Sequence, residues 1–179
     1  MENKKAERVL EEFLPRELLY DLGLYIQTCA HIELYICALI CEMEDLKIHS
    51  DTWIERHVGL RKMPTESLLK ALRRTGESTT HKDMIPRDQF NELVDWLLQY
   101  VSNRHIAVHG AFFKTPENEF RVNYWHLDKS QTPHVRQIEQ TVITRDLAHD
   151  LISDADRILR ILFGVLKTLG AVEQASSTC

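Results

Sequence analysis

The chain has 179 residues, 44% hydrophobic and 27% charged, so a single domain can bury a core without disulfides or a structural metal. The formal net charge of −5 excludes a protein that coats nucleic acids through a generally basic surface, so any nucleic-acid site must be local. Only 6 glycines and 5 prolines interrupt the chain, which favours long helices over many short strands.

The predicted elements begin with a short charged helix over 3–13 and a long helix over 15–44 that starts with a proline. The polar segment 44–50 is predicted to be a loop, and Asp51 is predicted to cap a short turn over 53–57. Apolar residues recur along the long helix at spacings of three and four, which places them on one stripe: Leu18, Leu22, Tyr25, Ile26, Cys29, Ile36 and Ile40.

A further helix is predicted over 64–76, begun by a proline and stopped by a glycine, and a polar loop follows over 77–85. A second long helix starts at Pro86 and runs to His109. Gly110 is expected to end that helix in a left-handed backbone conformation, which glycine adopts without steric cost.

The next segment, 111–127, has a Pro-Glu-Asn turn signal between two aromatic-rich extended pieces, which predicts a β-hairpin. A third strand is predicted over 135–143. Thr144 then caps a last long amphipathic helix that Gly170 should end, and the small polar tail 171–179 is expected to be disordered.

Long amphipathic helices bury their apolar stripes against one another. We therefore predict a mainly α fold, an antiparallel helical bundle of about five helices with a small β-hairpin insertion between the last two long helices. A single domain is expected over 1–170, with the insertion at roughly 111–143.

The N-terminal residues MENKKAERVLEEF are charged throughout and do not resemble a signal peptide. No apolar run approaches the roughly 18 residues that a membrane span needs. The four cysteines fit neither a disulfide framework nor a Cys-x-x-Cys pair, and three of them fall in one apolar stretch: Cys29, Cys37 and Cys41. We therefore expect a cytoplasmic protein without a membrane segment, whose cysteines are small core residues.

The segment 103–110 carries the candidate chemistry. At about 100° per residue, Arg104 falls on an apolar stripe that it shares with Leu97, Val101 and Val108. A permanent cation there is costly unless it is paired, and Glu33, on the stripe of the first long helix, is the internal candidate. Such a pair would either fix the register of two helices or orient Arg104 so that its remaining donors bind a phosphate.

His109 is the last residue before the helix-ending glycine. Histidine at that position is a candidate for proton transfer near neutral pH, and equally an ordinary cap that offsets the helix dipole. Because Arg104 and His109 are five positions apart, about 140° around an ideal helix separates them. A joint site therefore requires a distorted helix end, a long reach of the arginine, or a second subunit across a two-fold axis.

The sequence Arg104-His105-Ile106-Ala107-Val108-His109, near the end of a long helix and followed by Gly110, resembles the Arg-polar-x3-His motif of the HEPN superfamily. The upstream helix with Glu33 and the closing helix after an insertion are also similar to that family. The resemblance covers roughly 15–170, but only the motif segment matches the family specifically. It implies a homodimeric, metal-independent endoribonuclease without a cofactor, in which the ribose 2′-OH attacks the adjacent phosphate and leaves a cyclic phosphate.

The resemblance also implies a role for each motif residue. Arg104 would stabilise the charge of the phosphorane, and His109 would transfer a proton to or from a ribose oxygen. His105 and Glu33 would support this pair, and Asn103 would bind a phosphate or cap the helix. A toxin or defence effector that is held by an antitoxin or a regulatory protein would fit this activity. Because some members of the family lack nuclease activity, the alternative is a non-catalytic HEPN-like helical module that binds RNA, a nucleotide or a protein partner.

Three further patterns each have a functional and a structural interpretation. Basic residues between 53 and 76 would bind RNA or form a solvated helix face, namely Arg61, Lys62, Arg73 and Arg74. Aromatic residues of the hairpin would stack bases or pack the hairpin on the bundle, namely Phe112, Phe113, Tyr124 and Trp125. His105 and His109 have metal-ligand spacing, with His126 or His134 as a third ligand, but no His-Glu-x-x-His is present and we predict no metal.

Overall fold

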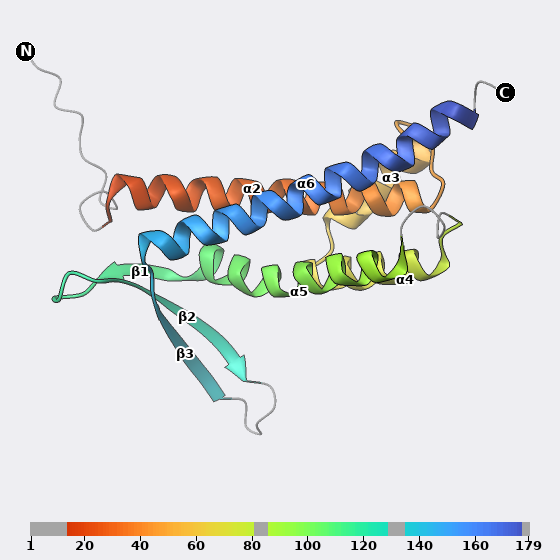
Figure 1. The fold of residues 1–179 in the computed structure, drawn as a ribbon. Coiled ribbons are helices and arrows are strands. Elements are labelled where there is room, and N and C mark those ends of the chain that lie inside the picture. Colours follow the sequence, from red (N-terminus) through yellow and green to blue (C-terminus); the bar gives the residue numbers. More distant parts are fainter. Residues whose placement is uncertain (1–13, 81–85, 129–134, 177–179) are drawn as a thin grey trace, which may run out of the picture. The chain divides into compact units, whose positions relative to one another are not determined.

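The computed structural model describes residues 14–80, 86–128 and 135–176, and the predicted helix over 3–13 lies outside these residues (Figure 1). The side chains at 99, 101, 102, 125–141 and 171–176 also lie outside the description. The chain divides into two compact units, Met1–Ile26 with Asn103–Ser153 and Gln27–Ser102 with Asp154–Cys179, which we call unit 1 and unit 2.

The described chain is mainly helical with a small antiparallel sheet, as predicted. The helices are α2 (Arg16–Met43), α3 (Asp51–Arg61), α4 (Thr65–Ser78), α5 (Arg87–His109) and α6 (Arg145–Ser176). The strands are β1 (Ala111–Lys114), β2 (Phe120–Asp128) and β3 (Val135–Val142). Each of the three long helices begins within one residue of the predicted position, because proline or threonine marks each start in the local sequence.

The first turn of α6 shows why that start could be predicted. The Leu147 backbone N–H donates a hydrogen bond to the Thr144 hydroxyl over 3.1 Å, so the predicted N-cap is confirmed. In contrast, α3 is capped by Ser50, which has extended backbone angles and accepts from the Trp53 N–H over 3.2 Å. The prediction that Asp51 caps this helix is wrong, because Asp51 is already the first helical residue.

The glycines differ from their predicted roles. Gly76 and Gly170 do not end their helices, since α4 continues to Ser78 and α6 continues to Ser176. Residues 171–176 of the predicted tail belong to α6. Helices tolerate an internal glycine at a cost of about 1 kcal/mol, so packing and neighbouring residues decide whether the helix stops.

Gly110 does follow the end of α5, but no described glycine has a positive φ, so the predicted left-handed conformation is wrong. Glycine is required at this position because a larger side chain would not fit. A Cβ atom on Gly110 would lie 2.3 Å from Val122 Cγ2 and 2.4 Å from the Ile106 carbonyl oxygen. The close approach of β2 to the end of α5 therefore explains the glycine.

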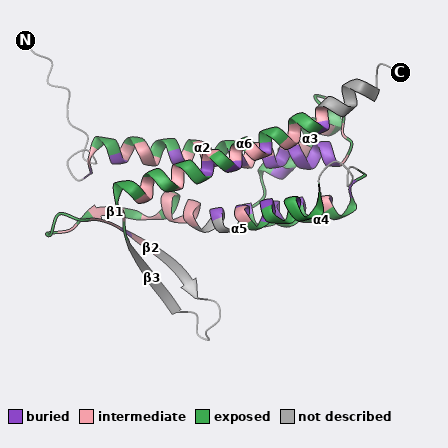
Figure 2. Cartoon of the chain, viewed as in Figure 1, coloured by how far each residue is buried: buried purple, intermediate pink, exposed green. Residues whose placement is uncertain are grey.

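Unit 2 has a core built from the apolar stripes of its helices. The largest of the fully buried side chains include Ile32, Ile36, Leu39 and Ile40 of α2, and Leu69, Leu72, Leu97 and Leu162 of the other helices. Figure 2 shows buried, intermediate and exposed positions alternating along α2 and α6, as expected for amphipathic helices. The predicted core role of the cysteines is confirmed, since Cys29, Cys37 and Cys41 are all at most 1% exposed.

Unit 1 contains the sheet, whose strand order is β1-β2-β3 with antiparallel pairing throughout (Figure 1). Phe112 pairs with Val122 in the first ladder, and Val122 is 1% exposed. β3 pairs with β2 along its whole length, from Asp128 opposite Val135 to Arg121 opposite Val142. The predicted insertion is thus a three-stranded meander, with the third strand where the sequence indicated it.

Helix α2 is long and apolar enough to cross a membrane by length and composition, with a mean hydropathy of 1.5 over 18 residues. The prediction that no segment meets this measure is therefore wrong for α2. In that window 44% of the residues are buried inside the protein, including Ile32 and Ile36. Packing in the core of unit 2 accounts for this apolar composition.

Candidate functional site

The end of α5 carries the predicted motif on a regular helix. The helix continues to His109, and the Gly110 N–H donates to the Ile106 carbonyl over 2.8 Å, which is the i to i−4 pattern of an α-helix. The distorted helix end that would bring Arg104 and His109 to one face is therefore absent. Their side chains leave the helix about 140° apart.

His105 and His109 form a pair of imidazoles on one side of the motif. Their rings stack with 5.8 Å between the centroids and 26° between the planes. His105 is half-buried and His109 is exposed to solvent. The spacing of four predicted a shared face, and the structure adds that the rings are in stacking contact.

Arg104 lies one turn before the helix end and is half-buried. The apolar stripe on which it was placed does not stay buried, because Leu97 is 0% exposed whereas Val108 is 41% exposed. The stripe that Arg104 shares with Leu97 and Val108 is therefore not buried along its whole length. Arginine can keep its apolar stem against the protein while its guanidinium binds a charged group.

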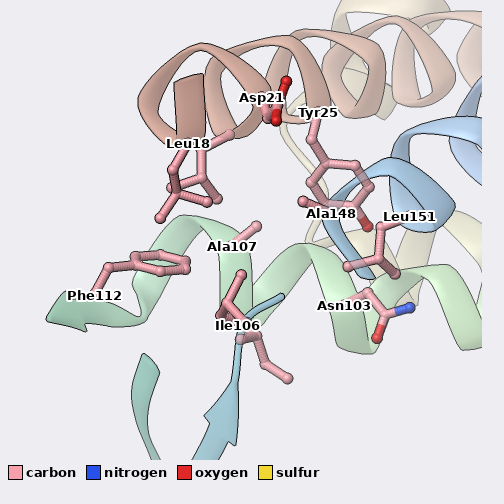
Figure 3. Close-up of a pocket in the computed structure, with 11 residues that line it drawn as sticks. Leu18, Asp21, Tyr25, Asn103, Ile106, Ala107, Phe112, Ala148 and Leu151 are labelled. Atoms are coloured by element: carbon pink, nitrogen blue, oxygen red, sulfur yellow. The ribbon is translucent and has the colours of Figure 1, made fainter. Parts of the chain in front are cut away.

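The inward side of the motif helix lines an apolar pocket in unit 1. Asn103, Ile106 and Ala107 form one wall of the pocket, as their spacing of three and four requires. In Figure 3, Leu18 and Tyr25 extend from α2 toward this wall, and Phe112 lies beside it.

The predicted role of Asn103 as a helix cap is wrong, since α5 continues for six residues beyond it to His109. Its side chain lines the apolar pocket of unit 1, and its predicted contact with a phosphate stays a prediction. Phe112 lines the same pocket, which supports the packing interpretation for this aromatic residue. Phe113 and Tyr124 are half-buried, and the side chain of Trp125 lies outside the described residues.

Glu33 lies in unit 2, on α2. Its carboxylate accepts a hydrogen bond from the Thr65 hydroxyl over 2.7 Å, at the first residue of α4. Arg104 belongs to unit 1, so its predicted pairing with Glu33 stays a prediction.

The four predicted RNA-binding cations lie in unit 2 and are all exposed: Arg61, Lys62, Arg73 and Arg74. Arg73 forms an ion pair with Asp95, with 3.0 Å between Nη2 and Oδ1. Surface ion pairs of this kind contribute about 0–1 kcal/mol to stability. The pair therefore fits the interpretation of a solvated helix face better than that of an anion-binding site. Sequence analysis did not anticipate the pair between Arg56 and Glu44, in which both guanidinium bonds are short, at 2.8 and 2.6 Å.

A metal site would need a third ligand near His105 and His109. Among the described residues, no group of three or more histidine, cysteine, aspartate or glutamate side chains could hold a metal ion. His134 and the side chain of His126 lie outside those residues.

An aromatic cluster of α3 and the loop before it was missed by the sequence analysis. The ring of Trp53 stacks on His57, with 4.6 Å between centroids and 10° between planes, and it meets His49 edge-on at 5.8 Å. Burial, and then the charge of Arg61, lower the pKa of His57 below its ordinary value of 6.5. The spacing of four between Trp53 and His57 was the signal that could have predicted this contact.

No family model matches the chain, and no curated protein and no solved structure matches it either. The HEPN resemblance therefore stays a prediction from the motif residues. A function for this site has to be argued from the positions of Arg104, His105 and His109.

Proposed function

We propose that this protein is a metal-independent endoribonuclease whose site is formed by Arg104 and His109. The observation that carries the proposal is the last turn of α5, where an exposed imidazole stacks on a second imidazole and a half-buried guanidinium lies one turn earlier. Imidazoles exchange protons near pH 7, and a guanidinium binds the oxygens of a phosphate with several donors. Together these groups supply what cleavage of a phosphodiester by the neighbouring hydroxyl requires.

In the proposed reaction, the ribose 2′-oxygen forms a bond to phosphorus while His109 accepts the proton of the 2′-OH. The bond from phosphorus to the 5′-oxygen breaks, and a protonated imidazole donates a proton to this leaving oxygen. The products are a 2′,3′-cyclic phosphate and a free 5′-OH, with no net change in protons. Arg104 stabilises the extra negative charge of the phosphorane as it forms.

The site is proposed to be shared between two copies of the chain. On a regular helix, Arg104 and His109 leave in directions about 140° apart, so one copy presents them poorly to the same phosphate. A two-fold axis beside the end of α5 would place the arginine of one protomer near the histidine of its partner.

The test is incubation of the purified protein with single-stranded and structured RNA in the presence of EDTA. The wild-type protein is expected to produce fragments with 2′,3′-cyclic phosphate ends. Arg104→Ala and His109→Ala should each lower the rate by a factor of about 10² or more. His31→Ala, which removes an exposed histidine from α2, is the matched control and should retain activity.

Thermal melts of all variants show whether a loss of activity is caused by a loss of folding. Cleavage that persists in either motif variant would overturn the proposed roles. Wild-type protein that binds RNA and leaves it intact would instead favour the non-catalytic binding module.

A further inference from the structure

The sheet of unit 1 begins where the proposed nuclease motif ends. His109 is the last residue of α5, and β1 starts two residues later at Ala111 (Figure 1). Phe113 is therefore four residues from His109, which places their Cα atoms at most about 14 Å apart. Both residues belong to unit 1, together with the turn 115–119 and β2. A strand of RNA whose phosphate lies at His109 can thus also contact side chains of β1 and β2.

One face of this sheet is packed and the other is open to solvent. Phe112 lines the apolar pocket of unit 1 and is paired with Val122, which is only 1% exposed. Successive side chains of a strand point to opposite faces, so the paired residues Phe113 and Arg121 lie on the other face. Val142, which is paired with Arg121 on that face, is 40% exposed. The face that carries Phe113 and Arg121 is therefore accessible to a ligand.

An ion pair lies on this open face next to Phe113. Arg121 donates to Oε2 of Glu119 from Nη2 over 2.8 Å and from Nε over 3.3 Å. Both bonds end on one oxygen, so Oε1 of the carboxylate and Nη1 of the guanidinium can bind other groups. The side chains of Glu119 and Arg121 are 47% and 37% exposed. The open face therefore presents an acceptor and a donor side by side to solvent.

The turn before β2 holds the backbone of Glu119 in position. The Thr115 N–H donates to the Glu119 carbonyl over 2.8 Å, and the Glu119 N–H donates to the Thr115 hydroxyl over 3.3 Å. Asn118 has a positive φ of 72°, and its N–H donates to the Thr115 carbonyl over 3.0 Å. These bonds close the hairpin, so the backbone position of this glutamate does not depend on a ligand.

The ion pair matches the hydrogen-bonding edge of guanine. Among the four RNA bases, guanine alone has two adjacent N–H donors, at N1 and N2, beside the carbonyl acceptor O6. A carboxylate can accept both of these bonds, and a guanidinium can donate to O6. Phe113 lies directly opposite Arg121, where paired Cβ atoms are about 4.5–5.5 Å apart. Its ring supplies the stacking surface on which proteins hold unpaired bases.

We propose that this face of the sheet binds an unpaired guanine of the RNA substrate near the scissile phosphate. The base stacks on Phe113, its N1–H and N2–H donate to Glu119, and Arg121 donates to O6. The inference rests on the proposed function for the position of the phosphate, and it makes the substrate single-stranded RNA that contains guanosine. Stacking on an aromatic ring tolerates every base, so the selectivity for guanine comes from Glu119.

The experiment measures binding of the full chain to short 2′-O-methyl RNAs by fluorescence anisotropy. These RNAs lack the attacking hydroxyl, so the protein binds them without cleavage. Each is an oligouridine with guanine, hypoxanthine, adenine or cytosine at its centre. The guanine RNA is expected to bind at least about ten-fold more tightly than the adenine and cytosine RNAs.

Hypoxanthine is the sharpest comparison, because it differs from guanine only by the missing N2 amino group. Glu119 then accepts one bond fewer, so the hypoxanthine RNA should bind about ten-fold more weakly than the guanine RNA. Equal binding of all four RNAs would overturn the proposal.

Variants assign the preference to this face. Glu119→Gln should remove the preference for guanine over hypoxanthine, because an amide has one acceptor oxygen where a carboxylate has two. Glu117→Gln is the matched control, since it removes the same charge from an exposed glutamate of the same turn, and it should keep the preference. Phe113→Ala should weaken binding of all four RNAs by about ten-fold, whereas Phe113→Tyr keeps the ring and should bind like the wild type.

Melting curves verify that these variants fold. An unchanged preference for guanine in Glu119→Gln would overturn the proposal. Cleavage that depends on Arg104 and His109 but has no preference for guanosine, with equal binding of the four RNAs, would overturn the guanine site alone. A preference for guanine in binding, without cleavage of unmodified RNA, would support the guanine site and count against the nuclease.

Discussion

The aromatic ring of Phe90 occupies the space that a side chain on Gly76 would need. A Cβ atom on Gly76 would lie 2.3 Å from two ring carbons of Phe90, which is only 7% exposed. Gly76 lies inside α4, two residues before its end. The glycine is therefore explained by close packing of unit 2 and not by a helix end.

This contact predicts the effect of Gly76→Ala on stability. Alanine normally stabilises a helix relative to glycine by about 1 kcal/mol, but the clash with a buried ring should cost about 1–3 kcal/mol. We expect a lower free energy of unfolding in urea. Gly164→Ala is the matched control, because nothing lies within 4 Å of a Cβ atom there, and it should stabilise the protein. Equal stabilisation by both substitutions would contradict the packing role of Gly76.

Gly110→Ala should destabilise unit 1. The new Cβ atom would meet Val122 Cγ2 at 2.3 Å and the Ile106 carbonyl oxygen at 2.4 Å, so we expect a loss of about 1–3 kcal/mol. Gly110→Asn separates this cause from backbone strain. Asparagine tolerates a positive φ, so it would restore stability only if Gly110 needed that conformation. We expect both variants to melt below the wild type.

Two adjacent leucines of α5 test the buried face of unit 2. Leu97 is 0% exposed and Leu98 is 45% exposed. Leu97→Ala should lower the free energy of unfolding by about 2–5 kcal/mol, because it leaves a cavity in the core. Leu98→Ala should change it by about 0.5 kcal/mol or less. Similar losses for the two variants would mean that the faces of α5 are assigned wrongly.

His57 should contribute to the pH dependence of stability. Its pKa is lowered in the folded protein, first by burial and then by Arg61, so the unfolded chain binds more protons below about pH 6.5. The contribution of the neutral imidazole is therefore present above pH 6.5 and is lost as the pH falls through the lowered folded pKa. An NMR titration should give a midpoint below 6.5 for His57.

The same linkage can be read from unfolding curves between acidic and neutral pH. His57→Gln should flatten the loss of stability on acidification. His31→Gln replaces an exposed histidine of the same unit and should follow the wild-type curve. A wild-type slope in His57→Gln would exclude this residue as the cause.

Mixed dimers test the proposed sharing of the nuclease site. When Arg104→Ala and His109→Ala chains are refolded together, about half of the dimers contain one of each. In those dimers the intact arginine and the intact histidine lie on different protomers, so a shared site should recover about a quarter of the wild-type rate. Refolding each variant alone is the control and should give no recovery. A mixture as inactive as its parents would count against a shared site.

Much of the fold follows from local sequence. The long helices could be predicted because apolar residues repeat with the helical period, and because Pro15, Pro86 and Thr144 mark helix starts in the residues themselves. The β-hairpin could be predicted because a turn signal separates two aromatic-rich extended segments. The spacing of His105 and His109 likewise indicated their shared face, since helix geometry alone sets it.

Only the tertiary structure decided which side chains contact the glycines and the polar residues discussed above. In sequence, Gly76 and Gly110 resemble helix ends. In the structure, each is needed because another element occupies the place of a side chain: Phe90 beside Gly76 and Val122 beside Gly110. Asn103 is polar but lines an apolar pocket, and Glu33 faces the same cavity as Arg61. Periodicity within one element specifies directions around its own axis, whereas packing between elements decides what lies in those directions.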